Sequence, residues 1–203
     1  MKALFFGGAF NPPSLAHIEM AYEAMKAVGY DRVVFVPSKS RYIQEDEKKK
    51  LLFEEEERFQ LLTQVASTRP WMEVSRIELD QKEQPRTYST MKALAPEYES
   101  LKLLLGSDKL GELETVWRHI DEIGKEFGFV CMTRNHDNVE KIFAENEYLK
   151  KRRSYFQVIP PLEKYQDISS TLIREKIKKK ESLKGLVPEE IREEVEKKEY
   201  SRV

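Results

Sequence analysis

Short apolar runs alternate with helical patterns along the chain, and this alternation is the feature that most restricts the fold. The apolar runs predict strands at Lys2–Phe6, Arg32–Pro37, Trp71–Ile77, Leu101–Leu105, Phe127–Met132 and Tyr155–Ile159. The helical patterns lie near Ser14–Val28, Phe53–Ser67, Ser89–Tyr98, Val116–Glu126, Val139–Lys151, Ser170–Lys180 and Pro188–Lys198. Apolar strands that are each followed by a helix are typical of a parallel sheet covered on both faces. The sequence therefore predicts an α/β fold with a doubly wound parallel sheet and two short C-terminal helices.

The chain is predicted to form one domain. Its 203 residues are enough to bury a full hydrophobic core without disulfides or a structural metal. Neither an internal repeat nor a linker rich in Gly, Pro or Ser divides it, so we expect one domain over residues 1–203, with a helical C-terminal part from about residue 168. The polar, highly charged stretch Ser38–Glu57 is expected to form a mobile loop that leads into a helix.

Charge and hydropathy exclude several classes of protein. The 35 basic and 36 acidic side chains leave a net charge of −1, so the chain lacks the global basic field that binds nucleic acid. No apolar segment is long enough to span a bilayer, and the apolar start is too short for a signal peptide. The single cysteine, Cys131, suits a reducing compartment. We expect a cytoplasmic protein with neither membrane nor nucleic-acid partners; the oligomeric state stays open, a homo-oligomer included.

The stretch LFFGGAFNPPSLAH, residues 4–17, joins the first predicted strand to the first predicted helix. The strand pattern breaks at Gly7-Gly8, and a helical pattern starts at Ser14, a good N-cap residue. A glycine turn before a helix start directs unpaired N–H groups and the positive end of the helix dipole towards one point. His17 follows Ser14 by three residues, so both side chains can face the same pocket. The sequence therefore predicts a site for nucleotide phosphate here.

Two common nucleotide motifs are absent. Ala-Phe-Asn-Pro follows Gly7-Gly8, so there is no G-x-G-x-x-G, and the Walker A spacing with Lys-Ser/Thr is also missing. A nicotinamide oxidoreductase and a P-loop NTPase are therefore disfavoured. A histidine at a helix start, without a nucleophile-base pair nearby, favours charge stabilisation on phosphate over a covalent intermediate.

Two signatures at opposite ends of the chain carry a resemblance to a known superfamily. GGAFNPPSLAH (residues 7–17) and ISSTLIR (residues 168–174) resemble the two signatures of the nucleotidyltransferase α/β-phosphodiesterase superfamily, G-G-x-F-[DN]-P-x-[HT]-x-G-H and I-S-S-T-x-I-R. Further segments resemble bacterial nicotinate-nucleotide adenylyltransferases: VFVPS (34–38), ERF (57–59), VS (74–75) with Glu78, TYS (87–89), LLGSD (104–108) with Trp117, and LVP (186–188). The resemblance spans almost the whole chain and implies a Rossmann-like fold.

The resemblance also implies a reaction. In this family the 5′-phosphate of nicotinate mononucleotide attacks the α-phosphorus of ATP in line, giving nicotinate adenine dinucleotide and pyrophosphate in NAD biosynthesis. The chain is thus expected to be an enzyme, a nucleotidyltransferase that binds ATP and nicotinate mononucleotide. Mg²⁺ is expected to arrive with ATP, because the sequence shows no metal cage of its own.

Site residues follow from the resemblance, position by position. The catalytic residues are His17, Ser14 and Arg174; His17, protonated when it faces phosphate, would stabilise developing charge, and the planar fork of Arg174 would clamp the β- and γ-phosphates. The expected nucleotide-binding residues are Gly7, Gly8, Ala9, Phe10, Gly106, Asp108, Ile168, Ser169, Ser170 and Thr171. The expected pyridine-nucleotide-binding residues are Pro37, Ser38, Lys39, Thr87, Tyr88, Ser89, Trp117 and Arg134. The resemblance would stack Trp117 on the pyridine ring and turn the Asp108 carboxylate to ribose hydroxyls.

The chain departs from the family pattern at a few positions. Ser14 stands where the family has His or Thr, Ala16 where it has Gly, and Met91-Lys92 where it usually has Asp-Thr. These replacements bear on efficiency and substrate choice more than on the fold. The sequence leaves three alternatives open: nicotinamide mononucleotide as the acceptor, another phosphorylated acceptor, and a nucleotide-binding relative without turnover.

Overall fold

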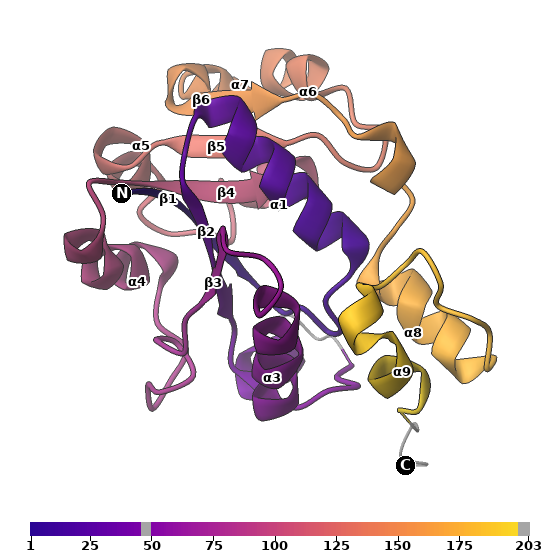
Figure 1. Cartoon of the computed structure of the whole chain (residues 1–203). Helices are drawn as coiled ribbons and strands as arrows, with labels where there is room; N and C mark the ends of the chain where they lie inside the picture. The colour runs from indigo at the N-terminus through magenta and orange to yellow at the C-terminus, as the bar shows by residue number, and fades with distance from the viewer. Residues whose placement is uncertain (46–49, 199–203) are drawn as a thin grey trace.

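A six-stranded sheet forms the centre of the computed structural model, which describes residues 1–45 and 50–198 (Figure 1). The strands are β1 (Lys2–Gly8), β2 (Arg32–Pro37), β3 (Met72–Val74), β4 (Ser100–Gly106), β5 (Phe129–Met132) and β6 (Phe156–Ile159). They lie in the order β3-β2-β1-β4-β5-β6, and every neighbouring pair is parallel. The chain builds outward from β1 to β3, then restarts beside β1 at β4 and builds in the other direction. The strand order therefore reverses between β1 and β4.

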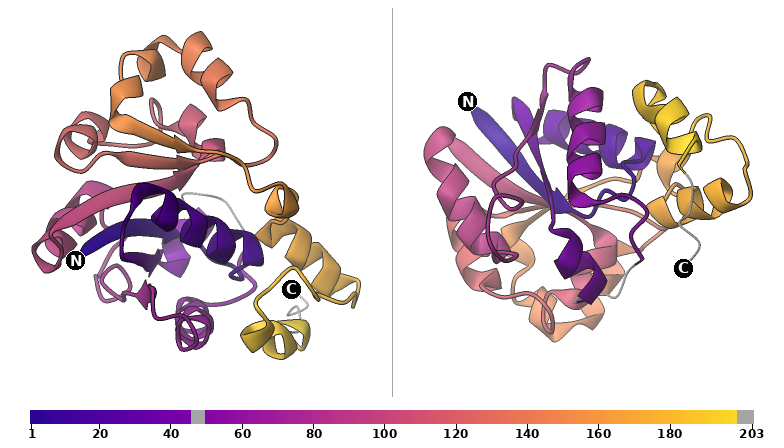
Figure 2. Two further views of the ribbon diagram at one scale, coloured as in Figure 1. Left: turned by 45° about the horizontal axis from the view of Figure 1, so that its top comes forward. Right: turned by 90° about the horizontal axis from the view of Figure 1, so that it is seen from below.

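Helices cover both faces of this sheet (Figure 1 and Figure 2). The α-helices are α1 (Leu15–Val28), α2 (Ser40–Glu45), α3 (Glu55–Ala66), α4 (Thr87–Leu94), α5 (Ile120–Glu126), α6 (Val139–Glu145), α7 (Glu147–Lys150), α8 (Ser170–Lys178) and α9 (Glu189–Glu196). Short 3₁₀ turns are η1 (Ala95–Glu97), η2 (Ser107–Glu112), η3 (Arg153–Tyr155) and η4 (Glu163–Tyr165). None of the helices within these described residues is long and apolar enough to cross a membrane.

Two hydrophobic cores lie on the two faces of the sheet because successive side chains of a strand point to opposite faces. Along β1, Leu4 and Phe6 enter a core completed by α1, α3, α8 and α9. Ala3 and Phe5 enter a second core completed by α4, α5, α6 and α7. Both cores are built from fully buried aliphatic and aromatic side chains, which explains why the strands are apolar at nearly every position. The expected doubly wound, Rossmann-like parallel sheet is confirmed.

Element boundaries differ from the predicted ones where a single residue changes the backbone. The predicted strand Trp71–Ile77 shortens to three residues, because the chain turns after Ser75. The predicted helix over residues 116–126 begins at Ile120, since His119 has φ of 62°. The predicted helix over residues 139–151 breaks at Asn146, whose extended backbone ends α6 and whose side chain caps α7.

The charged stretch over residues 38–57 is more ordered than the expected loop. Residues Ser40–Glu45 form α2, and Ser40 and Ile43 are buried against the rest of the protein. Leu52 and Phe53 are buried as well, and α3 begins at Glu55 instead of Phe53. The apolar residues scattered among the charges explain this, because they have a core to enter. The part of the prediction that concerns residues 46–49 lies outside the described residues.

Candidate active site at the carboxyl end of the sheet

A crevice is expected at the carboxyl end of the sheet, where the strand order reverses between β1 and β4. At such a reversal the loops that leave the two neighbouring strands go to opposite faces, and ligands of open α/β sheets bind between them. β1 ends at Gly8 and leads to α1 on one face. β4 ends at Gly106 and leads through η2 to α5 on the other face. The two expected nucleotide-binding glycine segments therefore flank the reversal.

The two signature segments, which are far apart in sequence, meet in the structure. The Ser170 hydroxyl donates to the carbonyl oxygen of Pro12 over 2.8 Å. The Arg174 guanidinium donates to the carbonyl oxygen of Asn11 over 2.9 Å. Figure 1 shows α8 beside the start of α1. The first turns of α1 and α8 thus lie side by side, and their unpaired N–H groups can serve one anionic ligand.

Ser14 and His17 form a capping box at the start of α1. The Ser14 hydroxyl accepts a hydrogen bond from the His17 main-chain N–H over 3.2 Å, and His17 Nδ1 accepts one from the Ser14 N–H over 3.1 Å. The Ser14 Oγ also lies 2.8 Å from His17 Nδ1. Since Nδ1 accepts from a main-chain N–H, a neutral ring carries its proton on Nε2. The same two residues therefore start the helix and fix the tautomer of the imidazole.

His17 is neutral in the protein without ligands, and its expected protonation beside phosphate stays a prediction. The ring packs against Phe10 and Phe6, with centroid distances of 5.2 and 6.2 Å, although the residue keeps some surface. This burial, together with the nearby positive charge of Arg134, lowers the pKa of His17 from 6.5 to about 3. The neutral ring is a hydrogen-bond donor through Nε2.

Gly106, Asp108 and Arg134 form a compact group at the ends of β4 and β5. The Arg134 guanidinium lies 3.6 Å from the Asp108 carboxylate, and both side chains are partly buried. A Cβ atom on Gly106 would come within 2.2 Å of the Asp108 carboxylate and 2.9 Å of the Arg134 side chain. Glycine is therefore required for this pair to approach the strand end. Arg134, expected on the pyridine side, thus neighbours Asp108, expected on the adenosine side.

A buried arginine that the motif analysis did not assign to the site anchors the loop after β1. Arg58, in the first turn of α3, has none of its surface exposed. It donates to the carbonyl oxygens of Ala9 over 2.7 Å and Ser38 over 2.6 Å, and the Ser38 N–H donates to Gly8 over 3.0 Å. Arg58 thus holds the expected nucleotide loop against the end of β2. In the sequence it follows four glutamates, a pattern typical of an exposed helix face.

Asn11 is a second structural residue that the sequence analysis missed. Its side-chain oxygen accepts from the N–H groups of Leu52 (3.1 Å) and Phe53 (3.0 Å), and its amide nitrogen donates to the Lys50 carbonyl (3.0 Å). The residue is 3% exposed, and its peptide bond to Pro12 is cis. These bonds tie the segment before α3 to the first signature. The sequence does not show which main-chain groups this side chain binds.

Most of the expected residues around α8 have defined roles in the local structure. Ser169 caps α8, because its hydroxyl accepts from the Leu172 N–H over 3.1 Å. Thr171 accepts from Arg174 over 3.0 Å, which orients the guanidinium. Ile168 is buried in the core beneath the helix start. The hydroxyls of this signature therefore build the turn, and the binding of phosphate by this segment stays a prediction.

The residues expected to hold the pyridine nucleotide come from two segments, Pro37–Lys39 and Thr87–Ser89, and from the single residues Trp117 and Arg134. Gly8 is paired with Pro37 across the sheet, so the end of β2 adjoins the nucleotide loop. Lys39 donates its side-chain nitrogen to the Leu79 carbonyl over 2.7 Å and its main-chain N–H to Gln84 over 2.8 Å. Its ammonium is therefore engaged with the loop between β3 and α4.

The second segment starts α4, with Thr87 and Ser89 on either side of Tyr88. The Tyr88 hydroxyl donates to Glu126 over 2.5 Å, and its ring stacks on His119 at 5.3 Å. The structure thus brings Tyr88 to α5, while Trp117 packs at the rim of the same core. Substrate contacts of these residues stay predictions.

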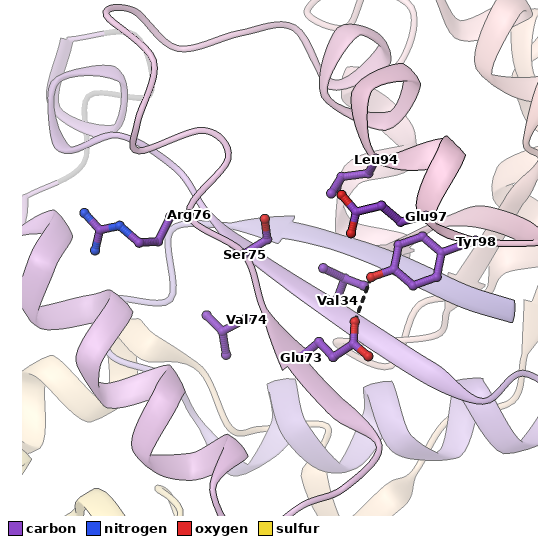
Figure 3. Close-up of a pocket in the computed structure, with 8 residues that line it drawn as sticks. All are labelled: Val34, Glu73, Val74, Ser75, Arg76, Leu94, Glu97 and Tyr98. Atoms are coloured by element: carbon purple, nitrogen blue, oxygen red, sulfur yellow. Dashed lines mark hydrogen bonds between the residues drawn. The ribbon is translucent and has the colours of Figure 1, made fainter. Parts of the chain in front are cut away.

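A separate cavity of about 410 Å³ lies along the edge strand β3 (Figure 3). Its walls include Val34, Glu73, Ser75 and Leu94, together with Tyr98, whose hydroxyl donates to Glu73 over 2.7 Å. None of the expected site residues lines it. The cavity is therefore separate from the group of residues around His17.

Metal-ligating side chains do not gather anywhere in residues 1–45 and 50–198: no three His, Cys, Asp or Glu residues there could hold one ion together. The expectation that Mg²⁺ arrives with ATP stays a prediction.

Comparison with known proteins defines the class of this fold and site. Residues 5–176 match the family model described as cytidylyltransferase-like, which covers both signatures and the sheet between them. The chain belongs to this family of nucleotidyltransferases.

Relatives narrow the class to the nicotinate-nucleotide adenylyltransferases. Proteins named probable nicotinate-nucleotide adenylyltransferase from Clostridium novyi and Caldicellulosiruptor saccharolyticus are each 32% identical to this chain; the matches cover 94% and 95%, respectively, of both chains. Nicotinic acid mononucleotide adenylyltransferase from Plasmodium falciparum, solved with NaAD, is 19% identical and superposes with a TM-score of 0.72 over 93% of this chain and 92% of its own. The resemblance inferred from the two signatures is confirmed.

Proposed function

We propose that this chain transfers the adenylyl group of ATP to the 5′-phosphate of nicotinate mononucleotide, giving nicotinate adenine dinucleotide and pyrophosphate. The observation that carries the proposal is the meeting of the two signature segments. Ser170 bonds to Pro12 and Arg174 bonds to Asn11, which brings the starts of α1 and α8 together beside the loop that follows Gly8. The names of the relatives support the choice of acceptor.

The adenylyl transfer requires from the protein mainly the positioning of the substrates and the stabilisation of charge. An oxygen of the mononucleotide phosphate bonds to the α-phosphorus of ATP while the bond from that phosphorus to the bridging β-oxygen breaks. Pyrophosphate leaves with the electron pair of that bond. Little covalent chemistry falls to the protein, so the rate depends on holding the two phosphates in line and neutralising their charge.

His17 and Arg174 are the proposed catalytic groups, with Ser14 as the residue that orients His17. The imidazole would donate a hydrogen bond from Nε2–H to a phosphate oxygen, which stabilises developing negative charge. Arg174 would bind the β- and γ-phosphate oxygens with its planar fork. The capping bonds from Ser14 to Nδ1 keep the ring in place throughout.

The two substrates are proposed to occupy the two sides of the reversal. ATP would lie along the Gly7–Phe10 loop, Gly106, Asp108 and the start of α8. The mononucleotide would lie between Pro37–Lys39 and Thr87–Ser89, with Trp117 beside its ring. Mg²⁺ would accompany ATP, held by the triphosphate oxygens, where it supplies neutralising charge.

Pyrophosphate release tests the function directly. Purified protein with ATP and Mg²⁺ is offered nicotinate mononucleotide or nicotinamide mononucleotide in separate assays. We expect faster release with the acid. Faster release with the amide would keep the chemistry and change the acceptor, and no release with either from protein that binds ATP would refute the proposed function.

A histidine variant tests the mechanism. His17→Gln is expected to lower kcat by about 10²–10³-fold, the loss seen when one donor to a developing oxyanion is removed. His136→Gln is the matched control, because it removes an exposed histidine from the other side of the strand reversal. A kcat for His17→Gln within a few-fold of the control would remove His17 from the reaction.

A further inference from the structure

Glu78 is a buried carboxylate outside the residues assigned to the proposed reaction. It lies in the turn between β3 and α4 and is 3% exposed. One carboxylate oxygen accepts from the Thr90 hydroxyl over 2.9 Å, and the other accepts from the Gln84 side-chain amide over 2.5 Å. Burial raises the pKa of Glu78 to about 6, so at pH 7.5 both oxygens act as acceptors. Burying an ionised group is costly, which makes its position informative.

Hydrogen bonds from Glu78 connect the two segments expected to hold the pyridine nucleotide. Thr90 belongs to the first turn and a half of α4, directly after Thr87–Ser89. The amide oxygen of Gln84 accepts from the Lys39 N–H over 2.8 Å, directly after the end of β2. The chain of bonds therefore runs from α4 through Glu78 and Gln84 to the segment Pro37–Lys39.

A second contact fixes the same junction. The Lys39 ammonium donates to the carbonyl oxygen of Leu79, the residue that follows Glu78, over 2.7 Å. The end of β2 is thus held to the 78–84 loop at both its main chain and its side chain. In this arrangement the Gln84 amide can face only one way, with its nitrogen to Glu78 and its oxygen to Lys39.

We propose that Glu78 is a positioning residue for the mononucleotide half of the site. Its carboxylate fixes the separation between the end of β2 and the start of α4, and the acceptor binds between these two segments. This role rests on the proposed function, since it concerns the acceptor in that reaction. A positioning residue of this kind governs binding of the mononucleotide and leaves ATP, which lies on the other side of the reversal, unaffected.

The Glu78→Met variant removes both acceptors from the network with little change in side-chain size. The Thr90 hydroxyl can turn to the Arg86 carbonyl, 3.4 Å away, but the Gln84 amide nitrogen loses the carboxylate that accepts its hydrogen bond. A donor that loses its acceptor in a buried network is costly enough to displace a loop. We expect the KM for nicotinate mononucleotide to rise about tenfold, with kcat and the KM for ATP within about twofold of wild type.

Glu78→Gln is the conservative variant that can keep the network. Its amide oxygen can accept from Gln84 while its nitrogen donates to the Thr90 hydroxyl, which in turn donates to the Arg86 carbonyl. This variant should keep the KM for the mononucleotide within about twofold of wild type. Glu83→Gln, an exposed neighbour in the same loop, is the matched control and should change neither KM.

The outcomes separate this role from simple structural damage. Equal rises in both KM values, a fall in kcat alone, or a Glu78→Gln variant no better than Glu78→Met would each overturn the proposal. Should Glu78→Met fail to fold, Thr90→Val removes one bond to the carboxylate and Thr90→Ser keeps it, so only the valine variant should raise the mononucleotide KM. A wild type that releases no pyrophosphate refutes the proposed function itself, and an active wild type with an unchanged KM in Glu78→Met refutes the positioning role alone.

Discussion

The buried imidazole of His17 should make the stability of this protein depend on pH in a way that one substitution removes. In the folded protein the pKa of His17 is about 3, and in the unfolded chain it returns to about 6.5. Below pH 6.5 the unfolded chain therefore binds a proton that the folded protein does not. The contribution of the neutral ring to the free energy of unfolding has its full value above pH 6.5 and is lost progressively as the pH falls towards 3.

The magnitude follows from the two pKa values. At pH 5, about 1.5 pH units below the unfolded value, the loss is about 2 kcal/mol, at 1.36 kcal/mol per unit. Glu78 works in the opposite direction, because its pKa is about 6 in the fold and 4.5 in the unfolded chain. As the pH falls, Glu78 binds its proton at a higher pH in the folded protein than in the unfolded chain. This difference adds about 1 kcal/mol of stability between pH 7.5 and 5. The wild-type curve alone therefore hides the contribution of His17.

Urea unfolding of wild type and His17→Gln at a series of pH values isolates the contribution of His17 to the pH dependence of stability. The glutamine does not titrate, while Glu78 and all other groups titrate in both proteins. Any loss of capping in the variant shifts its curve by a constant amount. The difference in free energy of unfolding between the two proteins should change by about 2 kcal/mol from pH 7.5 to pH 5, in favour of the variant. Parallel curves would show that His17 is not buried as a neutral ring, and His136→Gln serves as the comparison for loss of an exposed imidazole.

Three further substitutions test the supports of the site. Arg58→Met should lower the free energy of unfolding by about 2–4 kcal/mol in urea, because the buried carbonyl group of Ser38 and the half-buried one of Ala9 lose their donor. Asn11→Ala should cost about 2–3 kcal/mol and speed proteolysis of the chain before α3, whereas Asn11→Asp, which keeps the accepting oxygen, should cost less. Gly106→Ala should raise the KM for ATP several-fold because its Cβ would displace Asp108, while Gly111→Ala, with open space around it, should leave that KM unchanged.

The sheet was predictable because its strands are buried on both faces. Strands such as β1 and β4 are apolar at nearly every position, so the sequence marks them without ambiguity. The edge strand β3 was overestimated for the same reason, because Trp71 packs against the core from outside the strand. An apolar run in the sequence indicates burial, and residues outside helices and strands can be buried as well.

The local structure around the candidate site was predictable where residue type and spacing determine it, as at Ser14, which caps α1 three residues before His17. It was not predictable where a buried polar side chain holds main-chain atoms of a distant segment, as Arg58 and Asn11 do. Every residue carries main-chain groups, so the sequence does not indicate which of them a side chain binds. The lowered pKa of His17 in the protein without ligands was not predictable for a related reason, since it depends on burial and on the position of Arg134.

The capping box at the start of α1 also constrains the chemistry of inhibitors. Because the protein's own main chain occupies Nδ1, a ligand can meet the imidazole only at the protonated nitrogen. A compound designed for this crevice should therefore place an acceptor there, such as a sulfonyl, phosphonate or carbonyl oxygen. An amine or hydroxyl donor at the same point would oppose the ring proton, and acidifying the medium to pH 5 would not invert that preference.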